Sequence, residues 1–144
     1  MAQIAVAPFV LKDVRLKIAT DNYEKHVSSV TITPSTSADK LTWQGLTPAA
    51  SFSDAGTPET TWEVALEYAQ DWETTNSLSQ YLLDNAGQSK SIVFQPKAGT
   101  GKKTFTVQAT IVPGPIGGAV NTVQTSQVTL PVTGVPTVAS DGVA

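Results

Sequence analysis

Apolar and polar residues alternate along seven segments of the chain, which is the period of a strand with one buried face. The clearest segment is 61–69, where Trp62, Val64, Leu66 and Tyr68 occupy every second position. We expect the strands at 9–19, 26–33, 40–45, 61–69, 88–95, 103–112 and 120–132. A change of phase between Val123 and Val128 predicts a β-bulge in the last of them.

A single stretch of helical period interrupts the strands. Leu78, Tyr81 and Leu82 fall at i, i+3 and i+4 and form one apolar stripe, which we expect to pack on a sheet. The helix is expected to begin after Thr74 or Thr75 and to close at 85–87, where a glycine suits the left-handed conformation. Several strands, one helix and few catalytic side chains predict a mainly β domain that works through its surfaces.

The connection 46–60 is rich in Pro, Ala, Ser, Gly and Asp. A structureless connection of that length is uncommon inside a compact domain and usually has a function of its own. We therefore interpret it as a long inter-subunit loop that folds against a neighbour. Its candidate contact residues are Ala49, Ser51, Phe52, Asp54 and Gly56.

Length and composition limit the possibilities. The 144 residues suffice for one domain, which we place at 1–136 with a C-terminal tail at 137–144 that holds no core residues. The chain has no cysteine, so neither disulfides nor thiolate metal sites contribute. No apolar run approaches the roughly 20 residues that span a bilayer, and the first residues lack the basic region of a secretory signal. We expect no membrane insertion and synthesis in a cytoplasm.

Charge is distributed unevenly. The segment 41–89 contains seven acidic residues and no Lys or Arg, whereas the flanking segments carry a net charge of +1 and +3. One interpretation is an ordinary solvated surface. The other is a subunit with an acidic side and a basic side, which would favour head-to-tail stacking of copies.

The sequence contains no complete catalytic or cofactor-binding motif. The turn 98–103 has two glycines and two lysines but lacks the first glycine and the final Ser or Thr of a phosphate loop. His26 is the only histidine, too few for a zinc site. Glu63 and Glu67 lie four residues apart on one strand, about 13 Å at strand spacing, which exceeds the separation of a glycosidase pair. We expect no enzyme activity, no metal and no cofactor.

Two further patterns leave alternatives open. Trp43, Trp62 and Trp72 could form a carbohydrate platform, but inward-facing positions favour core anchors. The outward faces of the last two strands carry Thr, Gln and Ser instead of the charges that usually protect sheet edges. Either loops cover these edges, or the edges pair with copies of the same chain.

The block from Thr61 to Pro136 resembles the tail tube (major tail) proteins of bacteriophages with long, non-contractile tails, the lambda tail-tube type. The similarity consists of an ordered set of elements: the strand 62–68 that ends at an aromatic, the helix 78–83 followed by Asn-Ala-Gly, the strand 92–96, a hairpin, the strand through 105–109, a Gly-rich turn, and the strand 125–132 before 133–136. The N-terminal half matches more loosely.

This resemblance implies a small β-sandwich or partial barrel with one flanking α-helix, a fold shared with the tubes of contractile tails and of type VI secretion. It implies hexameric rings that stack into a hollow tube in the virion, with assembly in the host cytoplasm. Long loops bridge the rings in such tubes, which makes 46–60 the candidate for the ring-to-ring contact. The implied partners are further copies of the chain, the tape measure protein, tail tip and terminator proteins, and viral DNA that passes through without specific contacts.

A DNA conduit should not bind phosphates, because each contact with Lys or Arg adds affinity. Glu63 and Glu67 lie on the polar side of their strand, in the segment that has no Lys or Arg. They are the candidates for lining the lumen. The alternative is that they meet Arg15 or Lys17 of a neighbouring subunit.

The sequence also leaves two other functions open. One is a carbohydrate-binding or adhesin-like β-sandwich that uses the tryptophans. The other is a different ring-forming virion protein, such as a decoration protein or a tail terminator, which would close into oligomers without polymerising.

Overall fold

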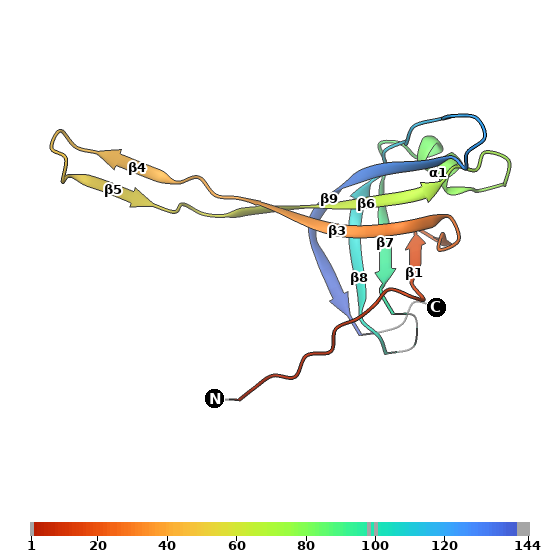
Figure 1. Cartoon of the computed structure of the whole chain (residues 1–144), viewed down its shortest axis with the longest axis horizontal. Coiled ribbons are helices and arrows are strands. Elements are labelled where there is room, and N and C mark those ends of the chain that lie inside the picture. Colours follow the sequence, from red (N-terminus) through yellow and green to blue (C-terminus); the bar gives the residue numbers. More distant parts are fainter. Residues whose placement is uncertain (1, 98, 100, 141–144) are drawn as a thin grey trace.

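The computed structural model describes residues 2–97, 99 and 101–140. Its main element is an antiparallel seven-stranded sheet in the order β2-β1-β7-β8-β9-β6-β3, and two further strands, β4 and β5, form a separate hairpin (Figure 1). The elements are β1 (Arg15–Ile18), β2 (Asp21–Asn22), β3 (Val27–Ser37), β4 (Leu41–Gln44), β5 (Ser51–Asp54), β6 (Glu59–Ala69), α1 (Leu78–Asp84), β7 (Ser89–Gln95), β8 (Thr104–Thr110) and β9 (Thr125–Ala139). The mainly β prediction with one helix is confirmed.

The sheet curls on itself, so that β3 and β6 run across β1, β7 and β8 (Figure 1). β9 makes the corner. Its first half, as far as Val132, pairs with β6, and its second half, from Val132 onward, pairs with β8. Between Thr133 and Thr137 the register with β8 shifts, and Gly134 there has a φ of +82°, which favours glycine. One continuous sheet thus forms a partial barrel.

The core fills the concave side of this sheet. The alternating residues Val64, Leu66 and Tyr68 of β6 are each at most 1% exposed, as the sequence pattern predicts. The other buried apolar side chains come from every part of the sheet and from the helix: Leu16, Ile18, Tyr23, Leu78, Leu82, Ile92, Phe94, Val107, Ala109, Ile111, Val128 and Leu130.

The helix α1 packs into this core with Leu78 and Leu82, both fully buried, while Tyr81 is half-buried. Its cap is Ser77, whose Oγ accepts a hydrogen bond from the backbone N–H of Gln80 at 3.4 Å. The expected start after Thr74 or Thr75 is therefore wrong by two to three residues.

The residues before Ser77 form a turn instead. Asp71 Oδ1 accepts hydrogen bonds from the backbone N–H groups of Glu73 and Thr74, at 3.0 and 3.1 Å. Hydrogen bonds from Thr74 and the neighbouring backbone lower the pKa of Asp71. After the helix, Gly87 has a φ of +86°, in the left-handed region as expected.

Several strand boundaries differ from the sequence prediction. β1 is limited to four residues, and β3 continues through Pro34 to Ser37, because Pro34 lies on an edge strand where no second ladder requires its N–H. β9 begins at Thr125 and not at Val120, and its bulge lies near Gly134 and not between Val123 and Val128. The segment expected as a tail without core residues is strand as far as Ala139. Residues 141–144 lie outside the described part of the chain.

Within the described residues, no helix has the length and apolar character that crossing a membrane requires.

A pair of leucines tests the burial pattern. Leu66→Ala removes a side chain that is 1% exposed and should lower the free energy of unfolding by about 2–5 kcal/mol. Leu41→Ala, at a residue that is 56% exposed on β4, should change it by no more than about 0.5 kcal/mol. Chemical denaturation of dilute protein measures both, and equal losses would contradict the core described here.

The buried Tyr23 predicts a loss of stability at high pH. Burial, together with the nearby Asp21 carboxylate, raises the pKa of Tyr23 to about 12 from an ordinary value of 10.0. The folded state therefore holds this proton more tightly than the unfolded state, so the stability contribution is present below pH 10 and is lost as the pH rises toward 12. Tyr23→Phe should show a smaller decline across this interval in denaturation curves recorded at successive pH values.

Candidate assembly surfaces

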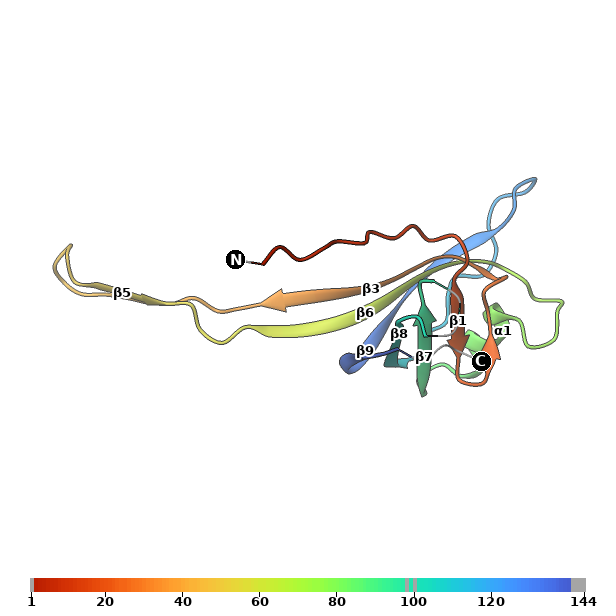
Figure 2. The same ribbon diagram turned by 90° about the horizontal axis from the view of Figure 1, so that it is seen from below.

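A long two-stranded hairpin projects from the sheet (Figure 1). β3 and β6 pair from Val27–Tyr68 outward to Ser37–Glu59, but β9 accompanies β6 only as far as the Trp62–Val132 pair. Beyond that point the hairpin has no third strand, and β4 and β5 form its far end. We call residues 35–61 the arm. Figure 2 shows that it extends well past the rest of the domain.

The expectation of a structureless loop at 46–60 is wrong. Ser51–Asp54 form β5, which pairs residue by residue with β4, and Glu59 already belongs to β6. The alternation of one Phe among small polar residues is too weak to predict such a strand. What the sequence did indicate, a segment outside the compact domain, holds for this part of the chain (Figure 2).

The tip of the arm exposes large apolar side chains. Trp43 and Phe52 are directly paired across β4 and β5 and are 63% and 61% exposed. Leu41, two residues from Trp43 on the same face, is 56% exposed. The expectation that Trp43 faces inward as a core anchor is therefore wrong, because the hairpin that carries it lies outside the core.

The residues predicted for the ring-to-ring contact all lie at this tip. Ala49, Ser51, Phe52 and Asp54 are exposed. Gly56 has a φ of +71°, and a Cβ at this position would collide with the carbonyl oxygen of Asp39 on the opposite strand. A glycine at this position thus allows the two sides of the arm to approach closely.

The sheet has one long free edge. β3 pairs only with β6, spans 11 residues and contains no charged side chain. Its edge-protecting features are Pro34 and a shift of register with β6 between Val27 and Ser29. The opposite edge is the two-residue β2. An uncharged edge of this length is a template for pairing with another strand.

The convex face of the sheet is polar and acidic. Glu63 and Glu67 point away from the core on β6, and Gln127 Nε2 on β9 donates to Glu67 Oε2 at 3.5 Å. The four strands β3, β6, β8 and β9 contain three glutamates as their only charged residues. Arg15 and Lys17 lie on β1, which β7, β8 and β9 separate from β6 in the order of the sheet.

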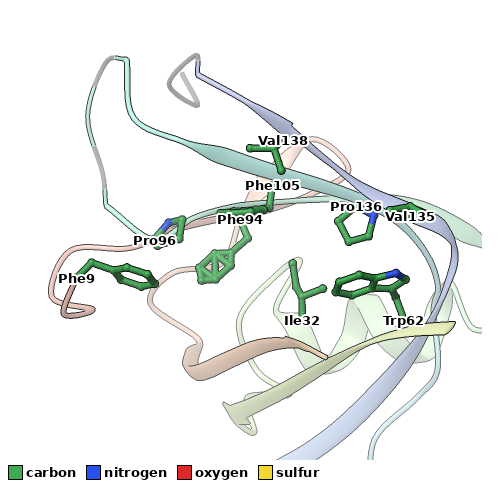
Figure 3. A pocket seen from close by; sticks show the side chains of 9 residues that line it. All are labelled: Phe9, Ile32, Trp62, Phe94, Pro96, Phe105, Val135, Pro136 and Val138. Atoms are coloured by element: carbon green, nitrogen blue, oxygen red, sulfur yellow. The ribbon is translucent and has the colours of Figure 1, made fainter. Parts of the chain in front are cut away.

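An open apolar pocket of about 310 Å³ lies at the root of the arm, where the core ends between the two halves of the curled sheet (Figure 3). Its walls are entirely aromatic, aliphatic or proline side chains: Phe9, Ile32, Trp62, Phe94, Pro96, Phe105, Val135, Pro136 and Val138. Sequence reasoning missed this pocket, because three of these residues belong to or adjoin the expected tail. Trp62, expected in the core, is half-buried at this pocket.

Other candidate chemistry is sparse. In residues 2–97, 99 and 101–140, no group of three or more His, Cys, Asp or Glu side chains is placed to hold a metal ion. The ring of His26 packs edge-on against Tyr23, with 5.7 Å between the ring centroids. Trp72 is half-buried, and its Nε1 donates to Gln70 Oε1 at 3.4 Å. The three tryptophans therefore lie in different places and form no common platform.

Comparisons with known proteins give little further information. No protein-family model matches the chain, and no curated protein does. Among solved structures, one similar chain belongs to the cryo-EM structure of the anti-feeding prophage (AFP) baseplate, 6-fold symmetrised. It is 14% identical, the alignment covers 97% of this chain and 98% of that chain, and the TM-score is 0.44. At this TM-score the similarity carries no weight for function, which we argue from the chain's own surfaces.

Proposed function

We propose that this chain is a structural subunit of a phage tail-type tube, in which copies form hexameric rings and the rings stack into a conduit for DNA. The observation that carries the proposal is the arm, a hairpin that leaves the domain with an apolar tip. Its partners in this role are further copies of itself, with the tape measure, tip and terminator proteins of the tail. No catalytic step enters this role.

The arm favours assembly for an energetic reason. A two-stranded hairpin without a covering layer is marginally stable in water, and ordering each residue costs about 1–2 kcal/mol. Burial of Trp43 and Phe52 against another subunit would offset part of this cost, at about 1.5–3 kcal/mol for a large side chain. A subunit that keeps such an arm benefits when a neighbour covers it.

The free edge of β3 supports lateral contacts. When sheets of neighbouring copies join edge to edge, the unpaired N–H and C=O groups of the edge find partners, and a closed ring leaves no edge at all. The absence of charged side chains within β3 is compatible with that pairing.

The acidic convex face supports the role of a conduit. If this face lines the bore, DNA meets Glu63 and Glu67 and no Lys or Arg from β3, β6, β8 or β9. Phosphates are then repelled and not bound, and the duplex can move.

Electron microscopy of concentrated purified protein tests the proposal. Hollow tubes built from stacked six-membered rings are expected. Closed rings that never stack would favour a decoration or terminator protein, and a persistent monomer that binds glycans would favour a carbohydrate-binding module.

Deletion of Ala49–Gly56 should separate folding from assembly. This deletion removes β5 and the tip of the arm, which contribute nothing to the core cluster, so the melting temperature of the monomer should stay within a few degrees of the parent value. Tubes should be absent in micrographs of the deletion variant. Normal tubes from this variant would contradict a role of the arm in assembly.

Reversal of the acidic face tests the lumen assignment. Tubes of the double variant Glu63→Lys, Glu67→Lys should retain short duplex DNA that parent tubes release, and retention should decrease steeply with salt. The neutral variant Glu63→Gln, Glu67→Gln is the matched control and should retain little. Co-sedimentation measures the bound fraction, and equal DNA retention by all three would place these residues outside the bore.

A further inference from the structure

We infer that the apolar pocket at the root of one arm is the receptor for the arm tip of a second copy, with Trp43 and Phe52 as the inserted side chains. This inference rests on the proposed function and adds to it the residues that join one layer to the next.

The pocket and the tip match in chemistry and size. All nine wall residues are apolar, and four of them are aromatic: Phe9, Trp62, Phe94 and Phe105 (Figure 3). The open volume of about 310 Å³ suits one or two aromatic rings. Such an unfilled apolar surface forgoes both burial and dispersion contacts, which an inserted aromatic side chain restores.

The tip presents its apolar groups in a form suited to insertion. The pairing of β4 with β5 holds Trp43 and Phe52 side by side on one face, with Leu41 next to them. All three are more than half exposed. They form a small apolar face on the β4–β5 pair, which lies in the far part of the arm (Figure 2).

The tip cannot reach the pocket of its own chain. Ile32 and Trp62, at the base of the arm, are walls of the pocket, and Trp43 lies eleven residues beyond Ile32 on an extended strand. At about 3.3 Å per residue this places the tip roughly 36 Å from the pocket. Insertion must therefore be intermolecular. Because pocket and tip are different surfaces, the contact is heterologous and can repeat from copy to copy, which gives an open stack when the rotation between copies does not close a ring.

Charge complements the apolar match. Next to the pocket, and sharing its residues Phe9, Pro96 and Phe105, lies a second depression with Lys97, Lys102 and Lys103. The arm carries three acidic residues, Asp39, Asp54 and Glu59, and one basic residue, Lys40. Opposite charge at the rim of an apolar contact directs the approach and selects the orientation.

The N-terminal segment of a second copy is the competing occupant. It exposes Ile4 and Val6 and leaves the domain on the same side as the arm (Figures 1 and 2). Residues 2–11 have no strand partner, however, so insertion would require ordering of an irregular chain at about 1–2 kcal/mol per residue. The paired strands of the tip already hold Trp43 and Phe52 in place.

Cysteine cross-linking tests the inference. The chain has no native cysteine, so any disulfide formed must join the introduced residues. In one variant Leu41→Cys is combined with Val135→Cys, which places one thiol beside Trp43 and one on the exposed wall of the pocket. Oxidation of assembled protein should give a ladder of disulfide-linked multimers on a non-reducing gel. The control combines Leu41→Cys with Leu83→Cys on the exposed side of α1 and should give no ladder.

The outcomes separate this inference from the proposed function. Tubes without the Leu41–Val135 ladder, or an intermolecular ladder with Val6→Cys and Val135→Cys in its place, would overturn the inference and leave the tube intact. Protein that never assembles would overturn both. If the cysteine variants themselves fail to assemble, a cryo-EM map of parent tubes decides, because Trp43 must then occupy the pocket of another copy and the layers must repeat every 30–40 Å or so along the arm.

Discussion

A pair of strands that projects into water has no second layer against which to bury its side chains, and the assembly proposed for this chain depends on that constraint. Inside the domain, β1, β6, β7, β8 and β9 contribute buried side chains to one core on the concave side, and β3 packs partly buried side chains against it. Beyond Trp62 and Pro34 this support ends, yet the sequence continues to place large apolar residues on the hairpin. Such residues gain from burial only when another molecule supplies the missing layer.

The curled sheet divides its two faces between two tasks. The concave face holds the apolar residues and the helix, whereas the convex face presents Thr, Ser, Gln and two glutamates. The corner in β9 makes this division possible, because one strand serves both halves of the sheet. It changes partner at Val132, shortly before Gly134, which has a positive φ. The pocket lies where this curl leaves the core open, beside the base of the arm.

Sequence periodicity predicted the interior well and the periphery poorly. The strand 61–69, the inward residues Ile92, Phe94, Val107, Ala109 and Ile111, and the stripe of Leu78 and Leu82 follow from period 2 or 3.6, because core burial imposes those periods. Of the arm, the sequence predicted only β4, at 40–45. β5 and the outer ends of β3 and β6 have no buried face and so show no alternation to detect. Trp43 was expected in a core for the same reason that Trp62 was, its inward-facing position in the strand pattern, and only the topology distinguishes them. The pocket required knowledge that β9 continues past Val132, through a Gly-Val-Pro sequence typical of a strand end.

Ile32 and Trp62 belong to two structures at once, since they are residues of the strands that carry the arm and also walls of the pocket. A change in the direction of the arm would therefore also displace two walls of the pocket. In a stack of copies, a guest seated in one pocket would fix the direction in which its host's own arm points. Each added layer would then prepare the site for the next, so growth would have a polarity, and free subunits would stay inert until a growing end accepted them.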